Sequence, residues 1–231
     1  MFLFYSEEIV GESIQLDEID SKHCLKVLRK KTGDVIDVTD GKGIIYLCEL
    51  REIDQRKLKV HIISKKEYSP PNVKLTIAIA PTKNQERLEW FLEKSIEIGI
   101  SEIFLIRTAR TEKTHLKYDR LQRIAIAAMK QSYNVRLPII HELSSLDKVM
   151  SKVAIYKHKF IAHCHRPQDH LSAFLPLDGS VVLLIGPEGD FSNEEVAYCV
   201  ELGFKEVSLG ASRLRTETAA LVGITILNLP T

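Results

Sequence analysis

From residue 73 onward, short apolar runs alternate with longer segments of helical periodicity, and this alternation constrains the fold more than any other feature of the sequence. A short unbroken apolar run favours a buried strand, whereas apolar residues at every third or fourth position favour a helix. Chains that alternate in this way form a mostly parallel sheet with helices on both faces. The predicted strands are 73–80, 102–106, 159–164, 181–185 and 206–209, and the predicted helices are 84–99, 119–132, 193–203 and 216–228.

Several side chains predict where these helices begin and end. Gly99 suits the C-terminal end of the first helix because glycine adopts positive φ readily. Ser192 and Glu195 form a capping-box pattern at the start of the third helix, and Thr216 is the expected N-cap of the last one. Trp90 lies among apolar residues and is expected in the core. The predicted buried face of the first helix consists of Leu88, Phe91, Leu92, Ser95 and Ile96.

The first 70 residues have a β-rich pattern instead. Residues 33–53 contain two β-branched runs joined by "DGKG", which indicates a hairpin. Residues 57–65 alternate apolar and polar side chains, as a further strand would. Residues 21–34 predict one short helix with Ser21 as its cap. Together these elements predict a small barrel-like β domain.

Paired prolines in "YSPPN", residues 68–72, separate the two patterns, because proline donates no backbone hydrogen bond. We therefore expect two domains, with residues 1–70 in the first and residues 73–231 in the second. Residues 1–10 lack a basic start and turn acidic, so we interpret them as a first strand rather than a signal peptide.

The composition of the 231 residues is that of an ordinary soluble protein, with 45% hydrophobic and 27% charged residues. No apolar run approaches the roughly 18 residues of a membrane span. The four cysteines have no C-x-x-C spacing, which favours reduced thiols over a disulfide framework or a zinc site. We therefore expect a cytoplasmic protein. The cysteines are Cys24, Cys48, Cys164 and Cys199.

A formal net charge of +1 conceals a strongly basic segment. Between residues 107 and 136, eight arginines and lysines are opposed by two acidic residues, a local charge of +6. Such a segment suits contacts with nucleic-acid phosphates, although a solvated helix face explains its helical members. A smaller basic set on the predicted N-terminal helix is equally compatible with RNA contact and with a solvated face. The candidate RNA-binding residues are Lys26, Arg29, Arg107, Arg110, Lys113 and Arg136.

Two glycine-bearing loops follow successive predicted strands near the C-terminus. The first, "IGPEGDF", begins at Ile185, and the second, "LGASRLRTETA", begins at Leu209. Ligands of parallel α/β sheets bind beyond the carboxyl ends of the strands, where both loops are expected. Taken by itself, the first loop is explained by an ordinary Gly-Pro turn. Two such loops, the second with Arg213, Arg215 and Glu217, favour a binding site.

These loops would contact a ligand through backbone groups, and they lack the sequence of a phosphate-binding loop. The chain has neither G-x-x-x-x-G-K-[ST] nor G-x-G-x-x-G. Gly186 and Gly189 permit close approach of the backbone to a ligand. Exposed amides and carbonyls there suit a flat, hydrogen-bonding ligand such as adenine.

The two loops resemble motifs of the RsmE family of 16S ribosomal RNA uridine N3-methyltransferases, within the SPOUT superfamily of knotted methyltransferases. "IGPEGDF" is similar to the family pattern I-G-P-E-G-G-F, and "LGASRLRTETA" is similar to L-G-x-R-I-L-R-x-E-T-A. Weaker similarities extend over the whole chain, including one to the family's N-terminal PUA-like domain. They are "EWFLEKSIEIGI", "RTAR", "MKQSYNVRLP" and "HCLKVLR".

Two places depart from these family patterns. Asp190 stands where the family has glycine, which puts a carboxylate into the turn. Ser212 and Arg213 stand where the family has Arg-Ile, which moves one arginine by one position. Backbone groups are expected to dominate cofactor binding, so the departures chiefly leave open which arginine faces the RNA.

The resemblance implies a trefoil-knotted C-terminal domain after a PUA-like β-barrel domain, with S-adenosylmethionine bound inside the knot. It also implies 16S ribosomal RNA as the substrate, preferably within the assembled small subunit, and a homodimer. The final helix is apolar nearly all round, so a partner subunit could cover one of its faces. The implied cofactor-binding residues are Leu184, Ile185, Gly186, Pro187, Glu188, Gly189, Leu209, Gly210, Leu214, Arg215 and Thr216.

The implied reaction methylates uracil N3, which is a poor nucleophile until its proton leaves. A nearby cation favours the uracil anion, so Arg215 is the first candidate for this role and Arg213 the second. Glu217 or Glu188 could accept the proton, and each could instead hold its loop by hydrogen bonds. The candidate catalytic residues are therefore Arg215, Arg213 and Glu217.

Two other functions stay open on the sequence alone. One is a related methyltransferase that modifies another RNA position or a ribose hydroxyl. The other is a non-catalytic RNA-binding module that retains the knot. A metal site is not expected, because His163 and His165 share one strand face but the residues around them lack the spacing of zinc ligands.

Overall fold

The computed structural model describes residues 2–52, 57–165 and 168–229. The chain divides into two compact units, of which the first consists of residues 1–70 and 126–137 and the second of residues 71–125 and 138–231. The helix α3, Tyr118–Gln131, contributes residues to both units. Across the described part of the chain, none of the helices is both long enough and apolar enough to cross a membrane.

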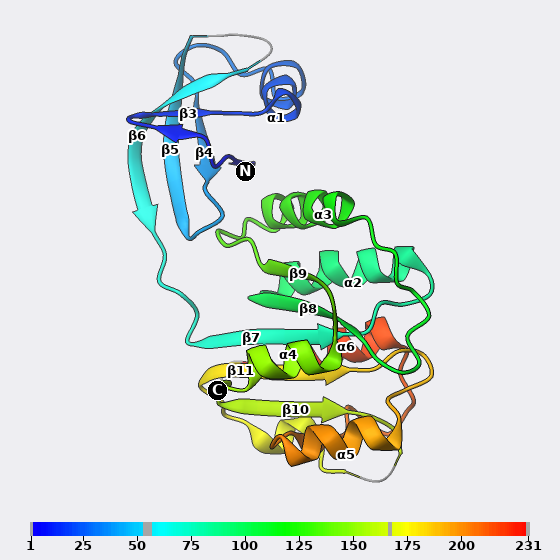
Figure 1. The fold of residues 1–231 in the computed structure, drawn as a ribbon. Coiled ribbons are helices and arrows are strands. Elements are labelled where there is room, and N and C mark those ends of the chain that lie inside the picture. The colour runs from blue at the N-terminus through cyan, green and yellow to red at the C-terminus, as the bar shows by residue number, and fades with distance from the viewer. Residues whose placement is uncertain (1, 53–56, 166–167, 230–231) are drawn as a thin grey trace. The chain divides into compact units, whose positions relative to one another are not determined.

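A six-stranded curled sheet forms most of the first unit (Figure 1). The strand order is β1-β4-β5-β6-β3-β2, with β1 parallel to β4 and the other pairs antiparallel. The predicted hairpin is confirmed as β4 and β5, and Gly41 and Gly43 in its turn have φ values of 71° and 109°. The strands are β1 (Leu3–Tyr5), β2 (Ile9–Val10), β3 (Ser13–Gln15), β4 (Val35–Thr39), β5 (Ile44–Glu52) and β6 (Lys59–Glu67).

The N-terminal helix begins earlier than predicted. The helix α1 spans Glu18–Lys22 and continues as a π-helical turn, η1, over His23–Val27. Its N-cap is Asp17, whose carboxylate accepts a backbone N–H of the first turn at 2.7 Å. The prediction that Ser21 is the cap is wrong: its hydroxyl is buried and accepts the Leu58 N–H at 2.8 Å. The Asp17 carboxylate satisfies a free amide one turn earlier, so the helix begins there.

The second unit contains a six-stranded sheet whose neighbouring strands all run parallel, as predicted. The strand order is β12-β10-β11-β7-β8-β9, so β10 lies between the two strands that follow it in the chain. The strands are β7 (Val73–Ile79), β8 (Glu102–Arg107), β9 (Ile139–Ser145), β10 (His158–Ala162), β11 (Gly179–Ile185) and β12 (Lys205–Val207).

One strand and one α-helix of this unit have no counterpart among the predicted ones: β9 and the helix α4, Leu146–Val153. β9 is an edge strand with partly exposed side chains, so it lacks the apolar run of a strand buried on both faces. α4 has only eight residues, too few for its periodicity to stand out. Its buried face consists of Leu146, Val149, Met150 and Val153.

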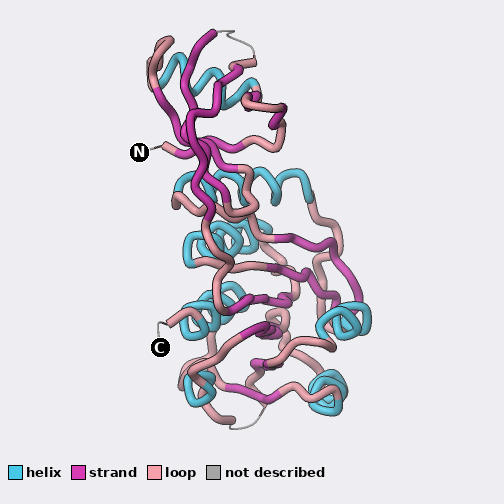
Figure 2. Tube along the Cα trace, turned by 90° about the vertical axis from the view of Figure 1, so that its left-hand side faces the viewer, coloured by secondary structure: helices cyan, strands magenta, loops and turns pink. Residues whose placement is uncertain are grey.

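Helices cover both faces of the parallel sheet (Figure 1, Figure 2). On one face, α4 and α5 (Asn193–Glu201) form an apolar cluster with strand residues that include Val182 and Leu184. On the other face, α2 (Gln85–Ile98) packs against α6 (Thr216–Leu227), and α6 contacts β7 and β11. Leu183, which alternates with Val182 and Leu184, lies against Gly223 of α6. A short 3₁₀ turn, η2 (Leu171–Phe174), also contacts α6.

The predicted ends of two helices are confirmed. Gly99 ends α2 with a φ of 113°, and Ser192 and Glu195 form a complete capping box at the start of α5. The predicted buried face of α2 is confirmed too. The prediction that Trp90 lies in the core is wrong, since it is 43% exposed. It follows Leu88 by two residues, which turns it about 200° around the helix axis and away from the buried face.

Candidate active site

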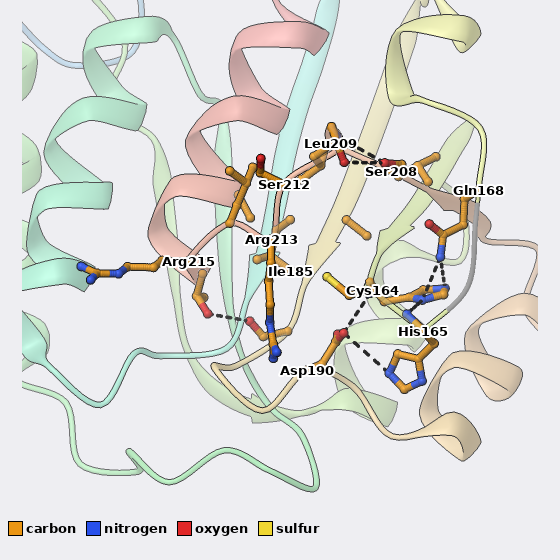
Figure 3. A pocket seen from close by; sticks show the side chains of 18 of the residues that line it. Cys164, His165, Gln168, Ile185, Asp190, Ser208, Leu209, Ser212, Arg213 and Arg215 are labelled. Atoms are coloured by element: carbon orange, nitrogen blue, oxygen red, sulfur yellow. Dashed lines mark hydrogen bonds and ion pairs between the residues drawn. The ribbon is translucent and has the colours of Figure 1, made fainter.

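Three loops at the carboxyl edge of the parallel sheet surround one cavity of about 810 Å³ (Figure 3). They follow β10, β11 and β12, which are neighbours in the sheet. Ligand cavities in proteins measure about 300–1,000 Å³, so this cavity can hold a cofactor. The predicted cofactor-binding residues that line it are Ile185, Gly186, Pro187, Glu188, Leu209, Gly210, Leu214, Arg215 and Thr216.

Two predicted cofactor-binding residues, Leu184 and Gly189, do not line the cavity. Leu184 belongs to the apolar cluster between the sheet and the helices α4 and α5. Gly189 faces Arg110, and a Cβ atom on Gly189 would come within 3.2 Å of the Arg110 Cδ atom. Glycine at this position therefore lets an arginine from another loop lie against the backbone.

The first turn of α6 is joined to the loop after β11. A Cβ atom on Gly186 would come within 3.1 Å of the Phe191 backbone nitrogen, so glycine lets this loop fold back tightly. The prediction that Thr216 is the N-cap of α6 is wrong, because Arg215 occupies that position. The Thr216 hydroxyl is buried and donates to the Gly186 carbonyl at 3.2 Å instead. This bond holds the two motif loops together.

The loop after β10 supplies cavity residues that the sequence prediction did not include. His163 is buried, with its Nε2 atom 2.9 Å from Glu206 Oε1, and its Nδ1 atom accepts the His165 N–H at 3.2 Å. Burial lowers the pKa of His163, and the hydrogen bond to Glu206 opposes this only in part, so the ring is neutral at pH 7. The available signal was position, since this loop also follows a parallel strand. Its lining residues are Ala162, His163, Cys164, His165 and Gln168.

The two arginines of the second motif have different surroundings (Figure 3). Arg213 donates to the Glu188 carbonyl oxygen at 3.4 Å and so connects the loops after β12 and β11. Arg215 is exposed, and its side chain extends away from the side of the cavity where His165 lies. The Glu188 carboxylate accepts the Lys83 backbone N–H at 3.0 Å, which joins the loop after β7 to the same cluster.

Glu217 lies in the first turn of α6 and is only 6% exposed. Its Oε1 atom lies 3.6 Å from the Arg87 Nε atom of α2. Its Oε2 atom is buried and has no hydrogen-bond partner among the described residues. A buried acceptor without a partner can accept a hydrogen bond from a ligand or a repositioned side chain.

Two predicted RNA-binding residues, Arg110 and Arg136, make hydrogen bonds within their own unit. Arg110 donates to the carbonyl oxygens of Gly189 at 2.6 Å and Phe191 at 3.2 Å. Arg136 donates to two backbone carbonyl oxygens, each at 2.5 Å. Both arginines therefore hold backbone segments in place. The other predicted RNA-binding side chains lie at the surface or are half-buried, and they are Lys26, Arg29, Arg107 and Lys113.

The prediction that His163 and His165 share a strand face is wrong, because β10 ends at Ala162 and both histidines lie in the loop that follows it. Both have hydrogen-bond partners within the protein. His163 is bonded to Glu206 and Gln168. The ring nitrogens of His165 lie 2.6 Å from Asn193 Oδ1 and 2.8 Å from the Phe191 carbonyl oxygen. In the ranges that the structure describes, no three His, Cys, Asp or Glu side chains are grouped as metal ligands would be. All four cysteines are free thiols.

A parallel sheet with a cavity at its carboxyl edge, in a chain that also carries a curled β unit, defines an α/β enzyme with an added β-rich module. The sequence matches two protein-family models. The RNA methyltransferase domain family matches residues 69–228, and the RNA methyltransferase PUA domain family matches residues 16–63. The chain belongs to the RNA methyltransferase family.

Individual relatives agree with this membership. The ribosomal RNA small subunit methyltransferase E of Aquifex aeolicus is 30% identical, over 98% of this chain and 99% of that protein. The corresponding Bacillus subtilis protein is 28% identical, over 97% and 92%. The crystal structure of a probable rRNA-methyltransferase from Porphyromonas gingivalis is 39% identical with a TM-score of 0.92, over 97% of this chain and 96% of that one. The small subunit methyltransferase E of Neisseria gonorrhoeae, bound to S-adenosyl methionine, is 27% identical with a TM-score of 0.87, over 97% and 95%.

Proposed function

We propose that this protein transfers a methyl group from S-adenosylmethionine to N3 of a uridine in the 16S ribosomal RNA of the small subunit. One observation carries the proposal: in a chain of the RNA methyltransferase family, both motif loops line a single cavity. The relatives from Aquifex aeolicus and Bacillus subtilis are named as small subunit methyltransferases. The similar Neisseria gonorrhoeae structure holds the cofactor.

The residues of the cavity fit this cofactor. Ile185, Val207 and Leu209 offer apolar surface to an adenine ring, and the loops offer backbone amides and carbonyls for its edge. Gly210 has a φ of 141°, and a Cβ atom there would meet no other atom within 4 Å. Its backbone therefore lies open to a ligand. When bound, the cofactor supplies an electrophilic methyl group on a sulfonium.

The protein's own task is to align the uracil and to stabilise it after loss of the N3 proton. Arg215, exposed at the rim of the cavity, is the first candidate for that stabilisation, and Arg213 is the second. The buried Oε2 atom of Glu217 is an acceptor without a partner among the described residues, which suits it to receive a proton or a hydrogen bond. Glu188 is engaged with Lys83, which favours a loop-holding role.

The proposal includes a trefoil knot in the C-terminal part, a homodimer and a cytoplasmic location. The position of β10 between β11 and β12 supports a chain that crosses itself at this edge of the sheet. Half-buried apolar side chains on α6 support a partner subunit, because a second copy could cover them. They are Ala219, Leu221, Val222 and Ile226.

The test is methyl transfer to small subunits purified from a strain that lacks the enzyme, with free 16S RNA compared in parallel. Nucleoside analysis should find 3-methyluridine, formed at a higher rate on the subunits. A methylated ribose or a different methylated base would replace the proposed target within the same family. Cofactor binding without any methyl transfer to either RNA would identify a non-catalytic module.

A further inference from the structure

Asp190 joins two of the three loops that form the cavity. Its Oδ2 atom accepts the Cys164 backbone N–H at 2.9 Å, and its Oδ1 atom accepts the Phe191 N–H at 2.8 Å. The same carboxylate lies 3.7 Å from His165 Nε2 (Figure 3). We infer that Asp190 is a positioning residue that fixes the loop after β10 against the loop after β11, and so organises the cofactor cavity before the ligand binds.

The backbone at this position shows what the side chain adds. Asp190 has a φ of 65°, in the left-handed region that glycine adopts without strain and most other residues adopt only with strain. The family pattern has glycine here, so the turn itself does not require a side chain. An aspartate tolerates this conformation better than most residues, and its carboxylate makes the link to Cys164 that glycine cannot make.

The surroundings of the carboxylate make the link effective. The Asp190 side chain is only 17% exposed, so water competes weakly for its oxygens. Hydrogen bonds from backbone N–H groups to an ionised carboxylate are roughly twice as strong as bonds between neutral groups. The His165 ring adds a second link, because its Nε2 atom lies 2.8 Å from the Phe191 carbonyl oxygen. Both links join the end of β10 to the segment 190–191.

An ordered cavity binds its ligand more tightly because less loop entropy is lost on binding. Here the cofactor part of the inference rests on the proposed function. The competing explanation is that the carboxylate only stabilises its own turn through the Phe191 N–H. Asp190→Gly removes both carboxylate bonds while glycine itself favours the turn, so the exchange rate of the Cys164 amide distinguishes the two explanations.

The experiment measures two quantities for the wild type, Asp190→Gly and Asp190→Asn: the hydrogen-exchange rate of the Cys164 amide without cofactor, and the Kd for S-adenosylmethionine by calorimetry. In Asp190→Gly, the amide should exchange about tenfold faster and the Kd should rise about tenfold. Asp190→Asn tolerates positive φ and keeps one acceptor oxygen for the Cys164 N–H, but its NH₂ group then faces the Phe191 N–H, so it should restore part of both. Asp178→Gly is the matched control, because Asp178 is an exposed aspartate just before β11 that pairs with Lys157. This variant should change neither the exchange rate nor the Kd.

Each of the other possible outcomes would overturn one part of the inference or of the proposed function on which it rests. Equal Cys164 exchange in the wild type and Asp190→Gly would overturn the link between the loops. Faster exchange with an unchanged Kd would overturn the positioning role and leave only a local bond. A wild type that does not bind S-adenosylmethionine would refute the proposed function, while the exchange rates would still decide whether the link exists.

Discussion

The Arg110 guanidinium donates a hydrogen bond to the Gly189 carbonyl oxygen at 2.6 Å, so a residue of the basic segment holds the loop of the first motif. The neighbouring Ala109 N–H donates to the Glu195 carboxylate at 2.7 Å, at the start of α5. The loop after β8 is thereby fixed both to the loop that follows β11 and to the first turn of α5. A cation that the sequence predicted to contact RNA therefore supports a loop of the cavity.

Arg110→Ala should weaken S-adenosylmethionine binding about three- to tenfold, because a hydrogen bond of this kind contributes about 0.5–1.5 kcal/mol. Calorimetry measures this Kd. Arg107→Ala is the control, since Arg107 is an exposed arginine of the same segment and should leave the Kd unchanged. Wild-type cofactor affinity in Arg110→Ala, together with weaker RNA binding and a shallower salt dependence, would show that Arg110 serves the RNA alone.

Cys164 should be the fast-reacting thiol of the native protein. It is exposed and lines the cavity, whereas the other three cysteines are buried. Burial raises the pKa of Cys24 to about 11 and that of Cys48 and Cys199 to about 12, so they carry almost no thiolate at pH 7.5. Iodoacetamide should therefore label one site, as peptide mass spectrometry can show, and Cys164→Ser should abolish the labelling.

Saturating S-adenosylmethionine should slow that labelling at least tenfold, because the bound cofactor would cover the thiol. Unchanged labelling in the presence of cofactor, at a concentration that calorimetry shows to be saturating, would place the ligand elsewhere. This measurement needs no RNA and so tests the cavity independently of catalysis.

The sequence predicted the parallel sheet and the two motif loops because both depend on local patterns. β7 and β11 are apolar runs buried in the sheet, and the glycines of the loops mark turns that local conformation requires. The whole-chain resemblance joined the two loops into one site. Helix ends were less predictable, as Ser21 and Thr216 show, because a hydroxyl can bond to another segment instead of its own helix.

The third loop of the cavity was not predictable from local patterns. Its residues lie next to the others because β10 is placed between β11 and β12, and strand order is a property of the whole sheet. The histidines of this loop suggested possible metal ligands rather than residues that line a cavity. The contacts of Arg110 depend on the same long-range arrangement, so a basic side chain in a loop could equally have faced solvent.

Glu102 should contribute to stability on the acid side. It is buried at the start of β8, with Lys74 at 2.5 Å and Tyr156 and His141 each at 2.6 Å. Burial alone would raise the pKa of Glu102, but the hydrogen bonds from Lys74, Tyr156 and His141 outweigh it and lower the pKa below 4.5. The unfolded chain therefore takes up this proton first, so the contribution is full above about pH 4.5 and is lost as the pH falls through the lowered value.

Glu102→Gln should lower the free energy of unfolding at pH 7 by about 1–3 kcal/mol, since charged hydrogen bonds are lost at a buried site. Urea denaturation between pH 3 and pH 7 measures this. The difference between variant and wild type should shrink as the pH falls below about 4.5. Glu142→Gln, at an exposed position on β9, is the control. A difference that stays constant over this range would refute a role for the Glu102 charge.

Arg215→Ala tests the proposed chemistry. Arg215 is the N-cap of α6, it lines the cavity, and its exposed side chain is within the loop that joins β12 to the helix. A guanidinium there can stabilise the uracil anion as the N3 proton leaves. The variant should lower the single-turnover methylation rate about 10²- to 10³-fold at saturating RNA and cofactor, the range for loss of one preorganised charge-stabilising donor. Cofactor affinity should change little, because backbone groups dominate it.

Arg213→Ala is the matched comparison, because Arg213 donates to the Glu188 carbonyl oxygen and holds the first motif loop. It should weaken cofactor binding several-fold and leave the rate at saturation within about threefold of the wild type, as expected for uniform binding. The reverse pattern, with the large loss of rate in Arg213→Ala and a wild-type rate in Arg215→Ala, would exchange the two roles. If Arg215 only contacts phosphate, its variant will bind RNA more weakly with a shallower salt dependence, yet methylate normally once the RNA is saturating.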